Sequence, residues 1–147
     1  MNKENKSNRR DCIRNTALAG AGLYIVPRHV LGRGYTAPSD KLNIAGVGCG
    51  GKAEVNLPAA WNKGSENIAA LCDVDDRMAV KAKQQWPNAP YYKDYRVLLD
   101  KEAKNIDAVI VTTPDHMHAP IALAAMQLGK HVYCEKPLTH DIMKHAY

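Results

Sequence analysis

The chain has 147 residues, of which 46% are hydrophobic, which is enough for one globular domain with a core and excludes a disordered polypeptide. Its net charge of +5 is confined to the N-terminal segment, because residues 1–41 contain 8 Lys and Arg against 3 Asp and Glu, and the remaining residues contain 12 of each. The part expected to fold therefore lacks the basic excess typical of nucleic-acid binding, and we expect no nucleic-acid partner.

Residues 1–40 have the order of an export signal. Arg9 and Arg10 resemble a twin-arginine motif, and an apolar stretch over residues 17–26 follows them. That stretch is too short to cross a bilayer as a helix, so we expect no stable membrane span. Cys12 stands where such motifs usually have Phe, and a basic tail without a transport role is the alternative. We predict a periplasmic or otherwise exported protein, or a cytoplasmic one if the leader is not functional.

Residues 42–51 join a short apolar strand to a glycine-rich turn. Gly46, Gly48 and Gly51 have the G-x-G-x-x-G spacing of a dinucleotide-binding fingerprint. In that motif Gly46 permits the tight turn, Gly48 lets the backbone approach a pyrophosphate, and Gly51 lets the next helix pack close to the strand. The positive end of that helix favours phosphate. An ordinary strand–turn–helix is the alternative.

A second apolar strand, residues 68–72, ends at Asp73, 22 residues after Gly51. A carboxylate here can accept hydrogen bonds from both hydroxyls of the adenosine ribose, and it repels a 2′-phosphate. We therefore predict NAD as the cofactor, with NADP disfavoured. Arg77 is the residue that could instead receive the phosphate.

Strands and helices alternate along the rest of the chain. The first helix, residues 51–61, contains Pro58, which should end it early or kink it. The further helices are predicted at 75–86, 94–101, 120–128 and 139–147, and the further strands at 91–93, 107–112 and 131–134. This alternation indicates βαβ units in a doubly wound parallel sheet, an α/β domain of Rossmann type over residues 41–147.

The cysteines and histidines do not indicate a metal site. Cys49, Cys72 and Cys134 each stand near a predicted strand end and form no C-x-x-C pair, so we expect free thiols, two of which could be neighbours. His116 and His118 with one nearby carboxylate are too few ligands for zinc.

Two further strand ends carry polar residues. Thr113, Pro114 and His118 follow the strand at 107–112. Glu135 and Lys136 follow the strand at 131–134. Ligands of open parallel sheets bind at the carboxyl ends of the strands, so both segments should lie beside the cofactor. An ammonium there can hydrogen-bond a substrate hydroxyl and lower the pKa of a neighbouring acid or base.

The sequence resembles the N-terminal half of the glucose–fructose oxidoreductase, inositol dehydrogenase and rhizopine catabolism (Gfo/Idh/MocA) family over about residues 40–147. The likeness rests on residues 45–51, 72–75, 107–118 and 129–137. The resemblance implies an NAD(P)-dependent enzyme acting on sugars or cyclitols, with Lys136 as its active-site lysine. It further implies a cis Lys136–Pro137 bond and a place for His118 near the nicotinamide ribose.

The family resemblance also implies a second domain that holds the substrate and the main acid–base residue. The chain stops at Tyr147, so we expect that domain to be absent and the chain alone to be inactive. The leading hypothesis is the NAD-binding part of an exported oxidoreductase acting on CH–OH groups of sugars or cyclitols, with a homo-oligomer as a further expectation. The alternatives are an NAD-dependent glycosidase working by oxidation and elimination, and a non-catalytic NAD-binding fragment. The residues expected to bind the cofactor are Gly46, Gly48, Cys49, Gly50, Gly51, Asp73, Thr113, Pro114, His118, Glu135 and Lys136.

Overall fold

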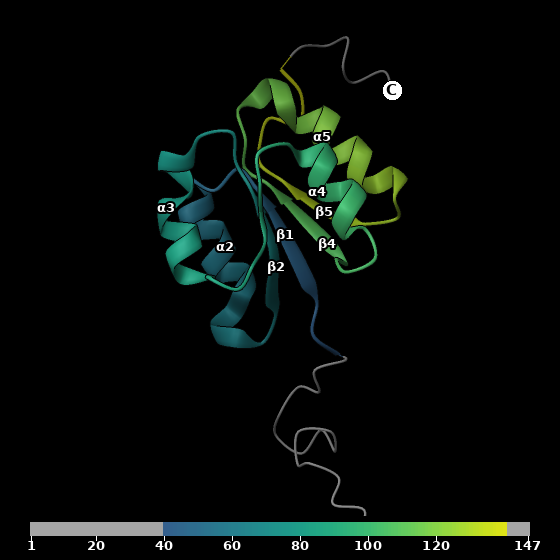
Figure 1. Cartoon of the computed structure of the whole chain (residues 1–147). Coiled ribbons are helices and arrows are strands. Elements are labelled where there is room, and N and C mark those ends of the chain that lie inside the picture. Colours follow the sequence, from purple (N-terminus) through teal and green to yellow (C-terminus); the bar gives the residue numbers. More distant parts are fainter. Residues whose placement is uncertain (1–39, 141–147) are drawn as a thin grey trace, which may run out of the picture. The chain divides into compact units, whose positions relative to one another are not determined.

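The computed structural model describes residues 40–140 (Figure 1). Its strands are β1 (Asn43–Val47), β2 (Asn67–Cys72), β3 (Tyr91–Tyr92), β4 (Ala108–Val111) and β5 (His131–Cys134). Its helices are α2 (Ala53–Trp61), the short 3₁₀ helix η2 (Asn62–Gly64), α3 (Asp76–Gln85), α4 (Tyr95–Glu102) and α5 (Asp115–Gln127). The predicted leader and residues 141–147 of the last predicted helix lie outside the described residues, and Thr139 and His140 are not helical.

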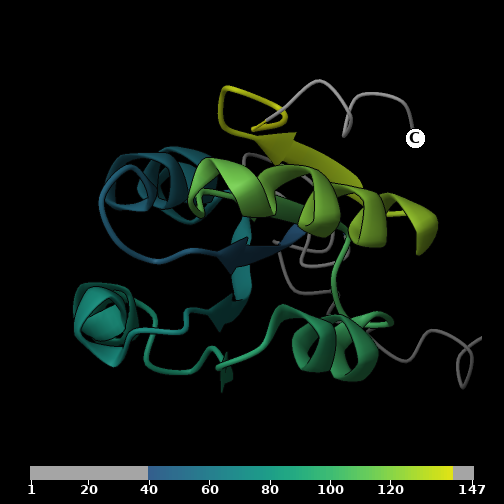
Figure 2. The ribbon, with the colours of Figure 1, turned by 90° about the horizontal axis from the view of Figure 1, so that it is seen from above.

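The strands form one five-stranded sheet in the order β3-β2-β1-β4-β5, and every pairing is parallel. Helices α2 and α3 cover one face, and α4 and α5 cover the other, as the two views in Figures 1 and 2 show. Strand β1 lies at the centre, and the order in which successive strands are added reverses between β1 and β4. The predicted doubly wound parallel sheet is therefore confirmed.

The core consists of two apolar layers, one on each face of the sheet. Leu98 of α4 and Ile121 of α5 pack against one face, and Leu57 of α2 packs against the other. Each of these side chains is at most 1% exposed, and burial of such a side chain stabilises the fold by about 1.5–3 kcal/mol. Strand β4 and strand β1 after Asn43 consist of apolar residues and glycine, as expected for strands with both faces covered.

Two helices contain an internal proline, and neither proline sets a helix boundary, while the alternative of a kink at Pro58 stays a prediction. Helix α2 continues through Pro58 to Trp61 instead of ending early, and α5 begins at Asp115 instead of Pro120. A proline inside a helix costs about 3 kcal/mol. Leu57 in α2 and Ile121 in α5 are both 1% exposed, and about 1.5–3 kcal/mol for each buried side chain offsets that cost.

Within residues 40–140, no helix is both long enough and apolar enough to cross a membrane.

Candidate cofactor site

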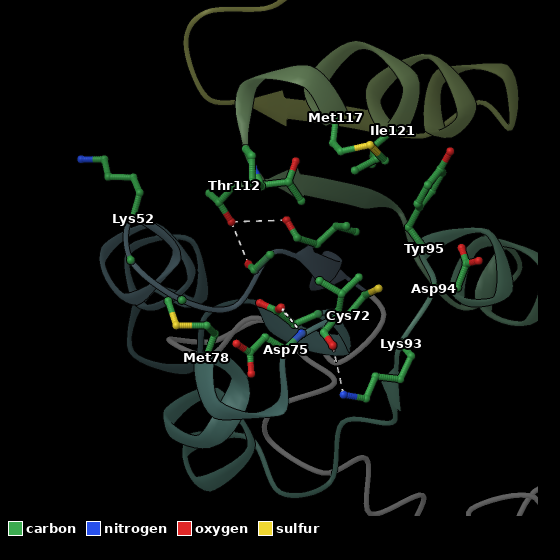
Figure 3. A pocket seen from close by; sticks show the side chains of 18 of the residues that line it. Lys52, Cys72, Asp75, Met78, Lys93, Asp94, Tyr95, Thr112, Met117 and Ile121 are labelled. Atoms are coloured by element: carbon green, nitrogen blue, oxygen red, sulfur yellow. Dashed lines mark hydrogen bonds between the residues drawn. The ribbon is translucent and has the colours of Figure 1, made fainter. Parts of the chain in front are cut away.

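A cavity of about 810 Å³ lies at the carboxyl ends of β1, β2 and β4 (Figure 3). Its size falls in the range of about 300–1,000 Å³ that is usual for small-molecule and cofactor pockets. The glycine turn and the start of α2 form one wall, and Tyr95, Met117 and Ile121 form the apolar opposite side. The cavity thus lies where the strand order reverses, which is the usual ligand position in an open α/β sheet.

Gly48 follows β1 and is hydrogen-bonded to the ends of both strands that flank it, β2 and β4. Its N–H donates to the carbonyl of Cys72 at 2.8 Å, and its carbonyl accepts from the Thr112 hydroxyl at 2.7 Å. Its φ of +86° disfavours other residues, and an added Cβ would lie 2.7 Å from the Thr112 backbone. Gly48 therefore needs to be glycine both for its conformation and for the close approach of β1 to β4.

The roles that the sequence motif assigned to Gly46 and Gly51 were wrong. Gly46 lies inside β1, and a Cβ there would be 2.8 Å from Leu57, so Gly46 is the residue that lets α2 pack close to the strand. Gly51 has a φ of +55°, and nothing lies within 4 Å of an added Cβ. Gly51 therefore serves the turn, not the packing of the helix.

The turn presents unpaired N–H groups at the start of α2. Gly50, Gly51 and Lys52 line the cavity, and their backbone N–H groups donate to no other described residue. A Cβ on Gly50 would collide with Met78 of α3. Unpaired N–H groups at the positive end of a helix fit the phosphates of a dinucleotide.

Asp73 is fixed by two backbone N–H groups. Its Oδ2 accepts from the Cys49 N–H at 2.7 Å, and its Oδ1 accepts from the Asp75 N–H at 2.9 Å. The first bond ties the end of β2 to the glycine turn, so the carboxylate lines the cavity in one orientation. Each oxygen keeps acceptor capacity for a ribose hydroxyl.

Two more aspartates follow Asp73, and both are paired with cations. Asp75 binds Arg77 with oxygen–nitrogen distances of 2.7 Å and 3.0 Å, and the guanidinium lowers the pKa of this carboxyl to about 2. Asp76 binds Lys93 at 2.6 Å, and hydrogen bonds from Lys93 and Lys83 lower its pKa to about 2. Sequence reasoning singled out Arg77 here but missed Lys93, which comes from the loop after β3 and lines the cavity (Figure 3).

The segment after β4 contributes Thr113 and Pro114 to the cavity wall. The Thr113 hydroxyl is buried and has no hydrogen-bond partner among the described residues, as expected for a group that awaits a ligand. His118 is 1% exposed and does not line the cavity. Its Nδ1 lies 2.6 Å from the carbonyl oxygen of Pro137, and its Nε2 lies 2.7 Å from that of Thr113. The imidazole therefore joins the loops that follow β4 and β5.

Glu135 and Lys136 stand at the end of β5, outside the lining of the cavity. Asn56 of α2 donates to Glu135 at 2.6 Å, and this bond is the leading reason that the pKa of Glu135 is lowered. The Lys136 side chain is exposed, and the Lys136–Pro137 bond is cis as expected. Asn56 and His118 thus anchor the residues on either side of Lys136, and sequence reasoning missed Asn56 because it is 79 positions from Glu135.

Cys49 and Cys72 are buried neighbours below the glycine turn. The Cys49 thiol donates to the carbonyl of Cys72 at 3.4 Å, and both thiols are free, as is that of Cys134. Burial raises the pKa of Cys49 and of Cys72 to about 12, so both remain neutral thiols near pH 7. Over residues 40–140, no cluster of His, Cys, Asp and Glu could hold a metal ion.

Comparison with known proteins agrees with this geometry. Residues 42–145 match the family model described as oxidoreductase family, NAD-binding Rossmann fold. Inositol 2-dehydrogenase of Salmonella typhimurium is 34% identical over 99 residues, which are 67% of this chain and 29% of that enzyme. A glycosyl hydrolase family 109 protein of Shewanella sp. is 32% identical over 115 residues, covering 71% of this chain and 25% of that protein.

Among solved structures, scyllo-inositol dehydrogenase of Lactobacillus casei with bound NAD(H) and scyllo-inositol matches with a TM-score of 0.61 and 25% identity. The match covers 71% of this chain and 30% of that enzyme, so the chain spans less than a third of the length of these relatives. The sequence match over residues 42–145 and the shared fold lead to one conclusion: the chain belongs to the Gfo/Idh/MocA oxidoreductase family and carries its NAD-binding Rossmann domain.

Proposed function

We propose that this domain binds NAD(H) in preference to NADP(H) and serves as the cofactor part of an oxidoreductase that acts on CH–OH groups of sugars or cyclitols. The observation that carries the proposal is the Asp73 carboxylate, which lines the cavity and is held by the N–H groups of Cys49 and Asp75. A fixed carboxylate accepts hydrogen bonds from free ribose hydroxyls and repels a 2′-phosphate.

Other residues along the cavity bind different parts of the cofactor. The N–H groups of Gly50, Gly51 and Lys52 bind the pyrophosphate, and the Thr113 hydroxyl supplies a hydrogen bond farther along the wall. The nicotinamide ring supplies the hydride acceptor when the cofactor is bound. The Lys136 ammonium, at the end of β5, donates a hydrogen bond to the substrate oxygen and stabilises negative charge on it.

Calorimetric titration of the purified chain with NAD and with NADP tests the cofactor assignment. We expect tighter binding of NAD, and Asp73→Ala should weaken NAD binding about tenfold or more, because hydrogen bonds to a charged group are lost. Asp100→Ala, an exposed carboxylate on α4 outside the cavity, is the matched control and should bind as the wild type does. Equal or tighter binding of NADP by the wild type would refute the preference.

A second candidate function is glycoside cleavage through transient oxidation by a bound nicotinamide. It is favoured by the 32% identity to a glycosyl hydrolase family 109 protein. The two reactions differ in what accumulates, since a dehydrogenase converts NAD to NADH stoichiometrically and a glycosidase regenerates its cofactor. Nicotinamide absorbance, followed with panels of cyclitols, sugars and aryl glycosides, separates them in a protein that carries the family's substrate domain. The same assay on the present chain tests the third reading, an NAD-binding fragment without turnover.

We also propose that the protein is exported by the twin-arginine route, on the strength of Arg9 and Arg10 followed by the apolar residues 17–26. A fusion of residues 1–40 to a reporter should reach the periplasm, and changing both arginines to lysine should keep it in the cytoplasm. Export that survives the change, or a wild-type fusion that never leaves the cytoplasm, would show that the leader assignment is wrong.

A further inference from the structure

We propose that Asp75 and Asp76 are specificity-determining residues, which keep Arg77 and Lys93 in ion pairs and so deny these cations to the 2′-phosphate of NADP. The inference rests on the proposed NAD site and concerns the part of the cavity beside Asp73. Without Asp75 and Asp76, this rim would carry cations able to bind a phosphate. With them, it favours a ribose that bears only hydroxyls.

Arg77 is the stronger of the two phosphate ligands. Asp75 lines the cavity, and its oxygens lie 2.7 Å and 3.0 Å from guanidinium nitrogens of Arg77, so the guanidinium sits at the rim. A guanidinium is the side chain best suited to bind phosphate through two parallel hydrogen bonds. Asp75 already accepts the two hydrogen bonds from the Arg77 guanidinium, although the Arg77 side chain as a whole is 89% exposed.

Lys93 reaches the same rim from the loop after β3. Its ammonium donates to the Val74 carbonyl at 3.2 Å and pairs with Asp76 at 2.6 Å (Figure 3 shows the first contact). Lys83 also pairs with Asp76, at 3.1 Å. Around Asp73, the carboxylates of Asp75 and Asp76 thus pair with the cations of Arg77, Lys83 and Lys93. The other charged residues that line the cavity are Lys52, Asp94 and Arg96.

The balance of charge at the rim explains why a phosphate is excluded. The two oxygens of Asp73 accept from backbone N–H groups, whereas Arg77, Lys83 and Lys93 each have a carboxylate partner. A 2′-phosphate entering here would meet the Asp73 charge and could gain a cation only by breaking an existing pair. These pairs are exposed and individually weak, so a single substitution can shift the balance.

Asp75→Asn is the decisive variant. Asp75 accepts from the Arg77 N–H at 2.9 Å as the N-cap of α3, and asparagine caps a helix about as well as aspartate. The variant therefore keeps the helix start and removes the charge that holds Arg77. Dissociation constants for NAD and NADP, measured by calorimetry on the full chain, should show the ratio of NADP to NAD constants falling about tenfold.

Two controls separate Arg77 from a general effect of charge. The double variant Asp75→Asn with Arg77→Ala should return the ratio to within about twofold of the wild type, because the released cation is gone. Glu54→Gln breaks the exposed pair of Glu54 with Lys81, two residues that do not line the cavity, and it should leave the ratio unchanged.

Each outcome has one meaning. A tenfold fall that requires Arg77 supports the inference. A wild type that binds NAD, together with an Asp75→Asn variant of unchanged ratio, overturns this inference alone. An equal fall in Glu54→Gln, or in the double variant that lacks Arg77, does the same. A wild type that binds neither dinucleotide overturns the proposed function and this inference with it. Unfolding in urea confirms that each variant is folded.

Discussion

Replacing Gly48 with alanine tests how tightly the chain packs where β1, β2 and β4 end at the cavity. A side chain at φ +86° costs about 1–2 kcal/mol. The new Cβ would also lie 2.7 Å from the backbone of Thr112, and overpacking of this kind costs about 1–3 kcal/mol. The Gly48 peptide cannot move aside, because its N–H is bonded to Cys72 and its carbonyl to Thr112. We expect the free energy of unfolding to fall by about 3 kcal/mol, which lowers the melting temperature by roughly 12–24 °C for a domain of about 100 residues.

Gly51→Ala is the matched comparison. Its φ of +55° is also positive, but nothing lies within 4 Å of the new Cβ, so only the conformational cost of about 1 kcal/mol applies. Thermal and urea unfolding of both variants, with calorimetric titration of NAD, measures the difference. Equal destabilisation by Gly48→Ala and Gly51→Ala, or a Gly48→Ala variant as stable as the wild type, would refute the claim that contact with the Thr112 backbone demands the glycine.

Three further perturbations test the packing below and beside the site. Gly46→Ala and Leu57→Ala should cost about 1–3 and 2–5 kcal/mol singly, and less than their sum together, because the smaller side chain vacates the space that the new Cβ needs; urea unfolding of the four proteins measures this coupling. His118→Leu should cost about 1–3 kcal/mol, since a carbonyl loses its N–H donor, and an unchanged unfolding midpoint would contradict a stabilising role for the imidazole contacts with Pro137 and Thr113. Burial raises the pKa of Cys49 and Cys72 from 9.0 to about 12, so the unfolded chain ionises first and stability should fall as pH rises through this window. The double variant with alanine at both cysteines should show a shallower decline in stability from pH 9 upward.

The sheet, its parallel pairing and the position of the cavity were predictable from the sequence because their causes are local. An apolar run, a glycine turn and an acid after the next strand each depend on neighbours along the chain, and Gly48 and Asp73 were identified in this way. The helix predicted at 94–101 is also confirmed as α4, whose Leu98 and Leu99 are 0% and 4% exposed.

The roles that depend on another element were not predictable in this way. Gly46 and Gly51 have each other's expected roles because the Leu57 side chain lies against Gly46. The glycine motif contains no information about that contact. Helix α5 starts five residues before its proline because Ile121 is buried against the sheet, which overrides the local preference of Pro120 for a helix start. The hydrogen bond from Asn56 to Glu135 is likewise a product of the tertiary fold.

The imidazole of His118 lies within hydrogen-bond distance of the loops after β4 and β5, so we expect these two loops to move together. Thr113 lines the cavity, and Pro137 follows Lys136 directly in the chain. Because His118 contacts the carbonyls of both Thr113 and Pro137, a ligand that displaces Thr113 should also displace the backbone beside Lys136. We expect the amide NMR signals of Thr113 and Lys136 to shift together when NAD is added, and to respond independently in His118→Leu. Occupancy of the cavity would then influence the position of a lysine that does not line it.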